Sequence, residues 1–369
     1  MSTATSATAT LFAAEAGFES ARQLHALPAG HPASRLHGHG FRVRVRAPLE
    51  SGWSAFPGAE VSQMAEALTA AVAPLDRRLL NDLVDEPSDA QLARWVQQRL
   101  AELGLPATPL VGVQSTALSG VDLNAQGEGH LWRRYRFHSA HRLPNVPLGH
   151  KCGRMHGHGF EAVLHVRLAH GEAAQLQADR LDEHWAPLHH QLNYTCLNEL
   201  PGLENPTSEM LSGWIWQRLH DTASGLVSVK VYETASCGAQ YDGHNYRIWK
   251  DFNLDSALRL RHAPEGHSLA GLHGHTYKLR LHLSAPLDEV MGWAYDFGDV
   301  KEVFKPVFKA LDHHALHDIP SLHDADAAHL GDWVLGQARQ RLPQLHRVDV
   351  FETEGCGAIV GFGELLSVI

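Results

Sequence analysis

The chain has 369 residues, of which 44% are hydrophobic and 20% charged, a composition typical of a soluble globular protein with room for two or three domains. Its formal net charge of −10 argues against a broad surface for nucleic acid or anionic membrane, and no apolar run approaches the length of a membrane span. Four cysteines form no disulfide ladder, which favours a reducing cytoplasm, and residues 1–11 have the composition of a loose tail rather than of a secretory signal.

One decapeptide pattern occurs three times along the chain. The copies begin at residues 30, 149 and 266, each with Gly-His at its start and His-Gly-His at its end; they read GHPASRLHGH, GHKCGRMHGH and GHSLAGLHGH. The spacing is that of whole domains rather than of a solenoid. We therefore expect three related units at 12–128, 129–248 and 249–369.

Each unit shows the same order of predicted elements. A Ser-Ala-x-x-Leu segment precedes the decapeptide, and alternating apolar and polar residues follow it, as in Phe41-Arg42-Val43, which indicates a strand with one buried face. A helical zone comes next, with Leu and Trp three residues apart and polar helix starts at residues 87–89, 206–209 and 324–326. Each unit closes with a further strand pair that begins at VGVQST, VKVYET or VDVFET.

The order strand–strand–helices–strand–strand predicts an α+β unit with a four-stranded antiparallel sheet. Such a sheet has two unpaired edges. Three sheets joined edge to edge would close a twelve-stranded antiparallel β-barrel with helices outside, and this closure accounts for the number of repeats.

The middle unit carries a candidate metal site. His156 and His158 lie two apart at the start of a strand and so share a face, and a hairpin would bring His141 alongside them. Three neutral imidazoles with a fourth position open are typical of a catalytic zinc ion. The alternative is a turn with hydrogen-bonded histidines. The other units have Arg22 and Leu258 where the middle one has His141, so we expect one zinc ion per chain.

Cys152 occurs in the middle decapeptide only. A free cysteine is often inert packing. Here Lys151 and Arg154 flank it, surroundings that favour the thiolate, and we interpret it as reactive.

The third unit holds an Asp312-His313 pair, in which the carboxylate can orient the imidazole for acid–base work. At the same place we align Asp76-Arg77 in the first unit and His189-His190 in the second. Asp312 could instead cap a helix. Because zinc ligands and cysteine are intact only in unit two and the pair only in unit three, we predict a catalytic site between these two units.

Glutamate is distributed in a similar way. Glu233 and Glu352 occupy one position in units two and three, whereas unit one has Ser115. A carboxylate at the end of a barrel strand could accept two hydrogen bonds from the amidine-like edge of a heterocycle. The first unit is therefore expected to be scaffold.

Taken together, these segments resemble the 6-pyruvoyltetrahydropterin synthase superfamily, and most closely its 6-carboxytetrahydropterin synthase branch. The matching text is HSAHRLPNVPLGHKCGRMHGHGF, LNELPGLENPTSEMLSGWIW and VYETASCG in unit two, and GWAYDFGDVKEVFKPVFKALDHHALHDIP and VFETEGCG in unit three. The resemblance implies a T-fold in which one chain replaces a trimer, and a homodimer that mimics the family's hexamer. It assigns zinc to His141, His156 and His158, catalysis to Cys152, Asp312 and His313, and the pterin ring to Glu233, with Glu352 as the alternative.

The activity that the resemblance implies is conversion of 7,8-dihydroneopterin triphosphate to 6-carboxy-5,6,7,8-tetrahydropterin, with loss of acetaldehyde and triphosphate. Thr207 and Ser208 are expected to help hold the pterin, and Lys151 and Arg154 to contact the triphosphate. Two alternatives stay open: another pterin side-chain reaction such as pyruvoyl formation, or a non-catalytic pterin-binding scaffold.

Overall fold

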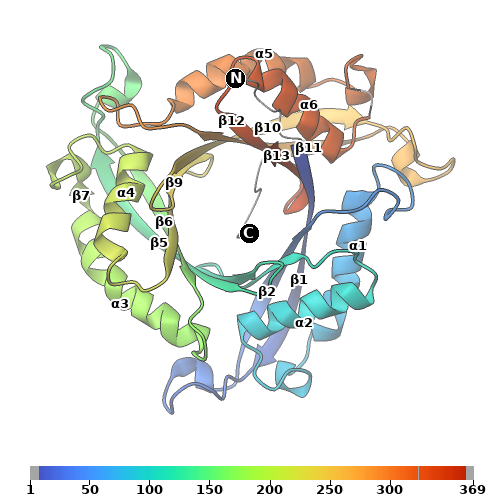
Figure 1. Ribbon diagram of the computed structural model, residues 1–369, viewed down its shortest axis with the longest axis horizontal. Coiled ribbons are helices and arrows are strands. Elements are labelled where there is room, and N and C mark those ends of the chain that lie inside the picture. The colour runs from blue at the N-terminus through green and yellow to red at the C-terminus, as the bar shows by residue number, and fades with distance from the viewer. Residues whose placement is uncertain (1–7, 323, 363–369) are drawn as a thin grey trace, which may run out of the picture.

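The computed structural model describes residues 8–322 and 324–362, and each repeat follows the predicted order of strands and helices (Figure 1). The first repeat contains β1 (Thr8–Arg22), β2 (His37–Ala47), α1 (Glu60–Val72), α2 (Asp89–Glu102), β3 (Leu110–Thr116) and β4 (Ser119–Leu123). The second contains β5 (Gly129–His141), β6 (His156–Arg167), α3 (Ala174–Leu192), β7 (Thr195–Cys196), α4 (Ser208–Leu219), β8 (Leu226–Thr234) and β9 (Cys237–Tyr241). The third contains β10 (Tyr246–Leu258), β11 (His273–Ser284), α5 (Phe297–Leu311), α6 (Ala327–Arg339), β12 (Leu345–Thr353) and β13 (Cys356–Phe362).

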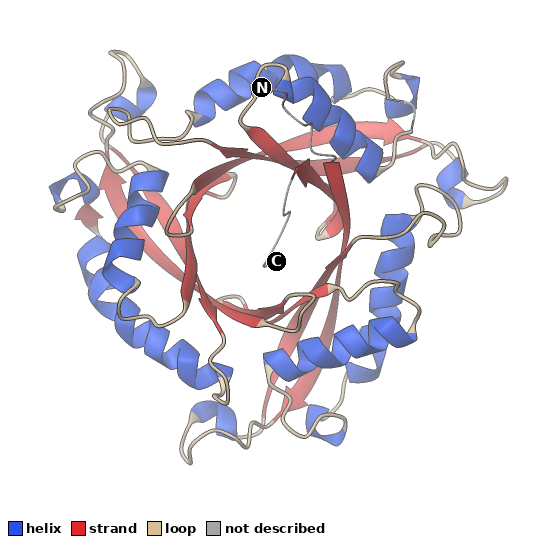
Figure 2. Cartoon of the chain, viewed as in Figure 1, coloured by secondary structure: helices blue, strands red, loops and turns tan. Residues whose placement is uncertain are grey.

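Twelve strands close into one antiparallel barrel, as predicted, and the helices surround it (Figure 2). The three sheets meet at three seams. Two seams are hairpins, β4 to β5 and β9 to β10, and the third joins β1 to β13. The two-residue strand β7 adds to β5 in parallel at the edge of the barrel. No helix in the described part of the chain is long and apolar enough to cross a membrane.

The predicted N-terminal tail is partly wrong. Residues 8–11 belong to β1, where Thr8 pairs with Phe362 and Leu11 with Ile359. They form a strand because β13 offers an edge that needs a partner. Residues 1–7 lie outside the described part of the chain.

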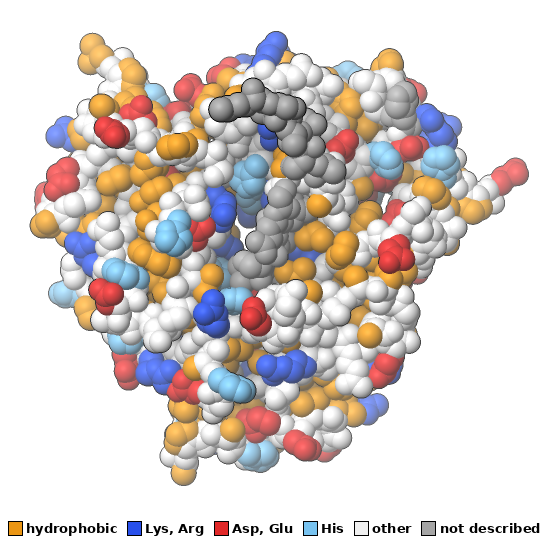
Figure 3. Space-filling model, in the orientation of Figure 1, with side chains coloured by type: hydrophobic (Ala, Val, Ile, Leu, Met, Phe, Trp, Pro, Cys, Tyr) orange, Lys and Arg blue, Asp and Glu red, His pale blue; other side chains and the backbone are white. Residues whose placement is uncertain are grey.

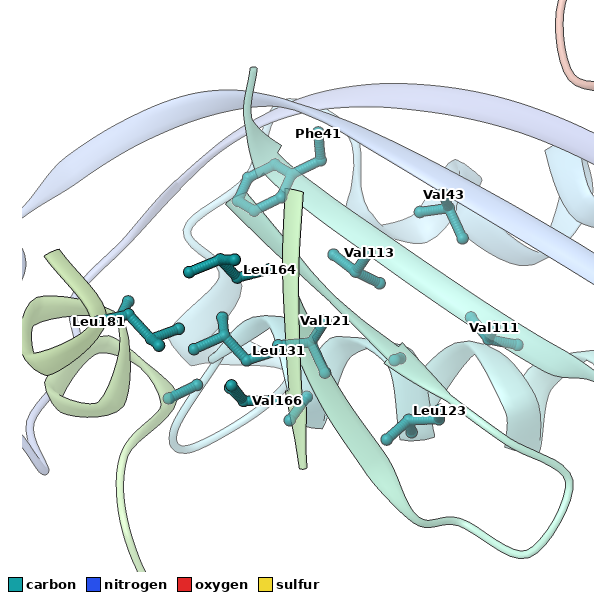
Figure 4. Packing of buried hydrophobic residues seen from close by; sticks show 14 of the residues in the cluster. Phe41, Val43, Val111, Val113, Val121, Leu123, Leu131, Leu164, Val166 and Leu181 are labelled. Carbon is teal, nitrogen blue, oxygen red and sulfur yellow. The ribbon is translucent and has the colours of Figure 1, made fainter. Parts of the chain in front are cut away.

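The outer face of the barrel carries the apolar side chains of each strand. Phe41, Val43 and Val45 of β2 are fully buried beneath the helices, as their alternation predicts. Figure 4 shows Phe41, Val43 and strand residues of the first repeat in one cluster with Leu164 and Leu181 of the second. The core is therefore continuous across the seam between these repeats.

The inner face of the barrel is charged. A hollow of about 610 Å³ is lined mainly by arginine, lysine and glutamate side chains. Lys, Arg and His side chains are also visible around the central opening at the end of the barrel that faces the viewer in Figure 3. An ion pair links the first two strands of each repeat: Glu15–Arg42 at 3.1 Å, Arg134–Glu161 at 3.3 Å and Asp251–Arg280 at 2.6 Å. The second repeat thus has the acid and the base exchanged between its strands.

The helices that precede the third strand of each repeat have the predicted polar caps. Ser88, Thr207 and Asp326 each accept a hydrogen bond from a backbone N–H in the first turn of α2, α4 and α6. The caps fix where these helices begin, and in the second repeat the capped end lies beside the candidate site described below.

Glycine is required at position 238 of β9, where the ring of Trp249 from the paired strand β10 lies against the backbone. A Cβ atom at Gly238 would overlap the carbonyl oxygen of Val231 and lie 2.5 Å from the ring of Trp249. Gly238→Ala is therefore expected to lower the free energy of unfolding by about 1–3 kcal/mol. Gly336→Ala, in an exposed position of α6 with open space around it, should raise it by about 0.5–1 kcal/mol. Urea denaturation of the two variants measures both; equal effects would contradict the steric argument.

Candidate metal and active site

Three histidines of the second repeat come together on adjacent strands. In the β5–β6 ladder His141 pairs with His156, and Ser139 pairs with His158. One ring nitrogen from each histidine lies within 4.8 Å of those of the other two. His141 is buried, whereas His156 and His158 are half-buried, so the cluster is open on one side. The predicted hairpin geometry of these residues is thus confirmed.

Backbone carbonyls set the tautomers of two of these rings. His141 Nδ1 donates to the carbonyl of Pro206 at 3.1 Å, and His156 Nδ1 donates to that of Arg154 at 2.8 Å. The Nε2 atom of each ring therefore keeps its lone pair, and that of His141 is buried without a hydrogen-bond partner. Burial also lowers the pKa of His141 and His158, which favours their neutral forms. Neutral, oriented imidazoles with an unpartnered nitrogen are what a divalent cation requires.

Glu233 lies beside the cluster at the end of β8. Its Oε1 is 3.4 Å from His158 Nε2, and its Oε2 accepts a hydrogen bond from Ser208 Oγ at 2.8 Å. Thr207 is occupied otherwise, because its hydroxyl donates to the carbonyl of Gly292 at 2.6 Å and accepts from the backbone of α4. The carboxylate is thus fixed by the first residue of α4 and retains acceptor capacity toward the open side.

Cys152 lies in a single 3₁₀ turn, Lys151–Gly153, and is half-buried. Burial raises the pKa of its thiol, and the carboxylates of Glu233 and Asp296 raise it further, while Lys151 acts in the opposite direction. Lys151 thus acts toward the thiolate, as its position in the sequence predicts, but burial and the two carboxylates outweigh it in the protein without metal. Lys151 and Arg154 are both exposed, so water screens them, whereas the side chains of Glu233 and Asp296 are largely buried.

Asp312 and His313 lie at the end of α5, next to β10. Asp312 Oδ2 is 2.9 Å from His313 Nδ1, and Oδ1 accepts a hydrogen bond from the backbone N–H of Asp255. Burial acts to raise the pKa of Asp312, but the hydrogen bond from His313 and that from Asp255 bring it below its usual value. The hydrogen bond to Asp312 raises the pKa of His313, whose ring is exposed. The pair is oriented as predicted, although its described contacts are all within the third repeat.

The predicted alignment of this pair with His189-His190 is wrong. The structural equivalents in the second repeat are Asn193 and Tyr194. Arg77, Tyr194 and His313 share a positive φ of 54–58°, and each donates its backbone N–H to the first strand of its own repeat. His189 and His190 instead lie in the last turn of α3, which is 19 residues long. The equivalence of Asp76-Arg77 is correct.

The pairing pattern places the histidine cluster and the Asp312-His313 pair on the two sides of one hairpin. β6 pairs with β8 only from Glu161 onward, and β10 pairs with β9 only up to Lys250, so both strands continue with one open edge. The strand order is β6-β8-β9-β10, so these two edges flank the end of the β8–β9 hairpin, three strand spacings or about 14 Å apart. The histidines lie on the β6 side and the Asp312-His313 pair on the β10 side. Glu233 lies at the hairpin between them.

Glu352, the alternative ring anchor, belongs to a different place. It occupies the Glu233 position in the third repeat, where burial and the nearby Asp326 raise its pKa to about 7. Its neighbours there include Tyr277, whose hydroxyl is buried without a hydrogen-bond partner. The two glutamates therefore lie at equivalent places in different repeats, and of these two Glu233 is the one next to the three histidines.

The first repeat has an ion pair where the second has the three-histidine cluster. Arg22, at the position of His141, is buried and lies 2.6 Å from Asp89 Oδ1, and Asp89 Oδ2 accepts from Ser115 Oγ at 2.7 Å. Asp89 and Ser115 stand where the second repeat has Ser208 and Glu233. The carboxylate is on the helix in the first repeat and on the strand in the second, and the hydroxyl is on the other element in each. The first repeat therefore has a carboxylate at this place, although the sequence pattern predicts that it has none.

The hollow beside Arg22 is also built from two repeats. It has a volume of about 380 Å³, and its lining from the second repeat includes Leu131, Arg133 and Ala174. In the third repeat Leu258 replaces the first histidine and leaves His273 and His275 without a third ring. A complete three-histidine cluster occurs, within the described residues, in the second repeat alone.

Sequence reasoning missed two residues at this site, His150 and Asp296. His150 accepts the backbone N–H of Cys152 on its Nδ1, and Asp296 Oδ2 lies 3.5 Å from its Nε2. In the sequence, His150 is one of the histidines shared by all three decapeptides, and Asp296 stands in the text YDFGD with no partner in view. The signal that could have found Asp296 is its position before α5, where the other repeats have Ala59 and Ala173.

Comparison with known proteins identifies the class. The 6-pyruvoyl tetrahydropterin synthase family matches this chain three times, at residues 12–118, 130–244 and 247–361. The chain therefore belongs to this family, in the form of three fused copies. The 6-carboxy-5,6,7,8-tetrahydropterin synthase of Synechocystis sp. is 36% identical over 119 residues, which span 30% of this chain and 91% of that protein.

Solved structures of low identity share local similarity. The 6-pyruvoyl tetrahydropterin synthase of Caenorhabditis elegans is 18% identical, with a TM-score of 0.29 over 32% of this chain and 95% of that one. The urate oxidase of Bacillus sp. TB-90 is 8% identical, with a TM-score of 0.31 over 63% of this chain and all of that one.

The three-histidine cluster predicts one metal ion per chain. Metal-free protein titrated with Zn²⁺ against a competing chelator is expected to bind one equivalent tightly. His141→Ala should weaken this binding at least about 100-fold, because it removes a buried ligand whose orientation the Pro206 carbonyl fixes. His273→Ala, in the third repeat, is the matched control and should leave the titration unchanged. Loss of the tight equivalent in His273→Ala would place the metal elsewhere.

Proposed function

We propose that this protein is a 6-carboxytetrahydropterin synthase-like lyase that converts 7,8-dihydroneopterin triphosphate and water to 6-carboxy-5,6,7,8-tetrahydropterin, acetaldehyde and triphosphate. The observation that carries the proposal is the cluster of His141, His156 and His158 with Glu233 in contact and Cys152 on the adjoining turn. Family membership and the relative of that name in Synechocystis sp. support it.

The three histidines would hold one zinc ion. Their neutral, oriented rings fit that ion, and the open side of the cluster leaves room for a substrate oxygen. Zinc, when bound, would polarise the side-chain oxygens of the substrate, which makes the adjacent C–H bonds more acidic, and would add positive charge near the Cys152 thiol.

Glu233 is proposed to hold the pterin ring. A pterin presents an N–H and an amino group side by side, and a carboxylate can accept one hydrogen bond from each. Ser208 keeps the carboxylate in place by donating to its Oε2. Thr207, bound to Gly292, contributes by fixing the start of α4 rather than through its hydroxyl. The ring would then lie at the hairpin end with its side chain toward the three histidines.

Cys152 and His313 are proposed to move protons at the side chain of the substrate. Cys152 belongs to the second repeat. The raised pKa of its thiol makes it a proton donor, and the positive charge of a bound zinc ion would favour its thiolate form. His313 lies on the β10 side, and Asp312 holds its Nδ1 proton, which leaves Nε2 available to the substrate. Lys151 and Arg154, both exposed next to Cys152, are proposed to contact the triphosphate.

A second reaction of the same class is pyruvoyl formation, the activity after which the family is named. Both reactions release triphosphate, but only the first yields acetaldehyde. The cytoplasmic location and the homodimer of barrels stay predictions from the sequence.

The test is product analysis of zinc-loaded protein with 7,8-dihydroneopterin triphosphate by mass spectrometry. Carboxytetrahydropterin together with acetaldehyde is expected, and a pyruvoyl product would select the second reaction. Cys152→Ala should lower turnover at least about 100-fold because it removes a proton carrier, while one equivalent of zinc remains bound. No conversion by zinc-loaded wild-type protein would reject the proposal, and full activity of Cys152→Ala would reject the role of the thiol.

The site is predicted to draw on the third repeat. Asp312→Asn should lower kcat at least about 100-fold, because the amide no longer stabilises a protonated His313. Asp76→Asn is the matched control: Asp76 accepts a backbone N–H from Glu19 just as Asp312 does from Asp255, but Arg77 follows it. Steady-state kinetics of the two variants measure the difference. Equal activities would confine the site to the second repeat.

A further inference from the structure

A segment of the third repeat lies across the second repeat beside the candidate site. This segment, residues 288–296, connects β11 to α5 and is here called the crossing segment. It is held by hydrogen bonds to the second repeat: Asn145 to Val290 O, Asn205 to Met291 O, Thr207 to Gly292 O at 2.6 Å, and Ala294 N–H to Glu209 at 2.8 Å. Most of these partners lie at the capped start of α4, next to Ser208 and Glu233.

The crossing segment ends at Asp296, whose two carboxylate oxygens have different partners. Oδ1 caps α5 by accepting the backbone N–H groups of Gly298 and Asp299, at 2.6 and 3.0 Å. Oδ2 reaches the second repeat, 3.5 Å from His150 Nε2. Both side chains are largely shielded, with 14% of Asp296 and 24% of His150 exposed, so the contact is only partly screened by water.

His150 transmits this contact to the turn that carries Cys152. Its Nδ1 accepts the backbone N–H of Cys152 at 3.2 Å, so in the neutral ring the proton is on Nε2 and points toward Asp296. A carboxylate at this place therefore selects the tautomer that caps the turn. The turn has only three residues, and its other described backbone bonds include Leu143 N–H to Cys152 O.

The other repeats share the capping histidine, but neither has a carboxylate at the helix-start position that Asp296 occupies. His31 and His267 accept the backbone N–H of Ala33 and Leu269 in the same way. His31 meets Asp179 of α3 at 3.0 Å, and His267 meets the ring of Phe56 at 5.0 Å. The helix-start position of Asp296 is Ala59 in the first repeat and Ala173 in the second. Only the repeat that adjoins the cysteine supplies a carboxylate from this position.

We propose that Asp296 is a positioning residue of the composite site, which holds His150 and, through it, the turn that presents Cys152 to the substrate. The catalytic part of this inference rests on the proposed function. The contact between Asp296 and His150 can be tested separately, through the reactivity of the Cys152 thiol. The crossing segment is then the second element, after the Asp312-His313 pair, by which the third repeat completes the site of the second.

Asp296→Asn separates the two tasks of the carboxylate. Asparagine caps helices as well as aspartate does, so α5 should keep its start. With the amide oxygen on the helix, the amide nitrogen faces the Nε2 proton of His150, and two donors cannot bond. His150→Asn is the partner variant: its side-chain oxygen can still accept the Cys152 N–H, but the side chain is too short to reach Asp296.

Two measurements are made on each zinc-loaded variant. One is the rate of Cys152 alkylation by iodoacetamide, followed by peptide mass spectrometry, which is expected to rise about three- to tenfold in both variants as the turn loosens. The other is steady-state kinetics, where kcat should fall about 10- to 100-fold while KM stays within about twofold, because the reacting group is displaced and substrate binding is not weakened. The kcat of the variant that combines Asp296→Asn and His150→Asn should be no lower than that of the less active single variant.

Asp179→Asn is the matched control, since it removes the same kind of contact from His31 in the first repeat. It should leave both measurements unchanged. If alkylation is unchanged in Asp296→Asn and His150→Asn, the positioning role is rejected, whatever the activity. If alkylation rises but wild-type protein forms no carboxytetrahydropterin, the contact stands and the proposed reaction fails. If Asp296→Asn alone loses activity, the carboxylate acts on the substrate and not through His150.

Discussion

The unpaired edges of a four-stranded sheet are the constraint on which this structure depends. Each repeat has two such edges, and the backbone groups along them need partners. Pairing at the β4–β5, β9–β10 and β1–β13 seams joins these edges into one ring and satisfies the backbone groups of the paired stretches. Closure puts the apolar face outside, beneath the helices, and turns the charged face inward. It also leaves β6 and β10 with open ends that flank a hairpin, and the candidate site lies there.

Fusion of three copies in one chain frees each copy to change on its own. In the proposed site, side chains come from two neighbouring repeats, so one such site needs His141, Cys152 and Glu233 in one repeat and Asp312 with His313 in the next. The first repeat shows what replaces them: Arg22 and Asp89 fill the space with an internally neutral pair. Both repeats have a hydrogen bond between strand and helix at this place, Ser115 to Asp89 in the first and Ser208 to Glu233 in the second, with the carboxylate on opposite elements.

Much of this could be predicted from the sequence, and the rest could not for identifiable reasons. Period-two alternation and the triple decapeptide indicate the barrel, and the spacing of His156 and His158 places both on one face. The failure at His189-His190 has a conformational cause, since the equivalence of Tyr194 and His313 depends on a positive φ that no residue type marks. The carboxylates that raise the pKa of the Cys152 thiol, Glu233 and Asp296, could not be linked to it from the sequence because they are far from it along the chain. Asp296 itself was missed because its contact with His150 joins residues of different repeats.

The β1–β13 seam has a consequence for how the molecule comes into being. Phe12 pairs there with Ala358, near the two ends of the chain, whereas β9 and β10 meet through a hairpin of a few residues. Loop closure makes the first kind of pairing slow and the second fast. During synthesis, the neighbourhood of Cys152 and Glu233 can therefore assemble with the third repeat before the ring closes. The candidate site thus lies at the boundary between the second and third repeats, which are joined by a short hairpin and can pair early. The β1–β13 boundary, which joins distant parts of the chain, lies between the first and third repeats, and neither of these has a complete histidine cluster among its described residues.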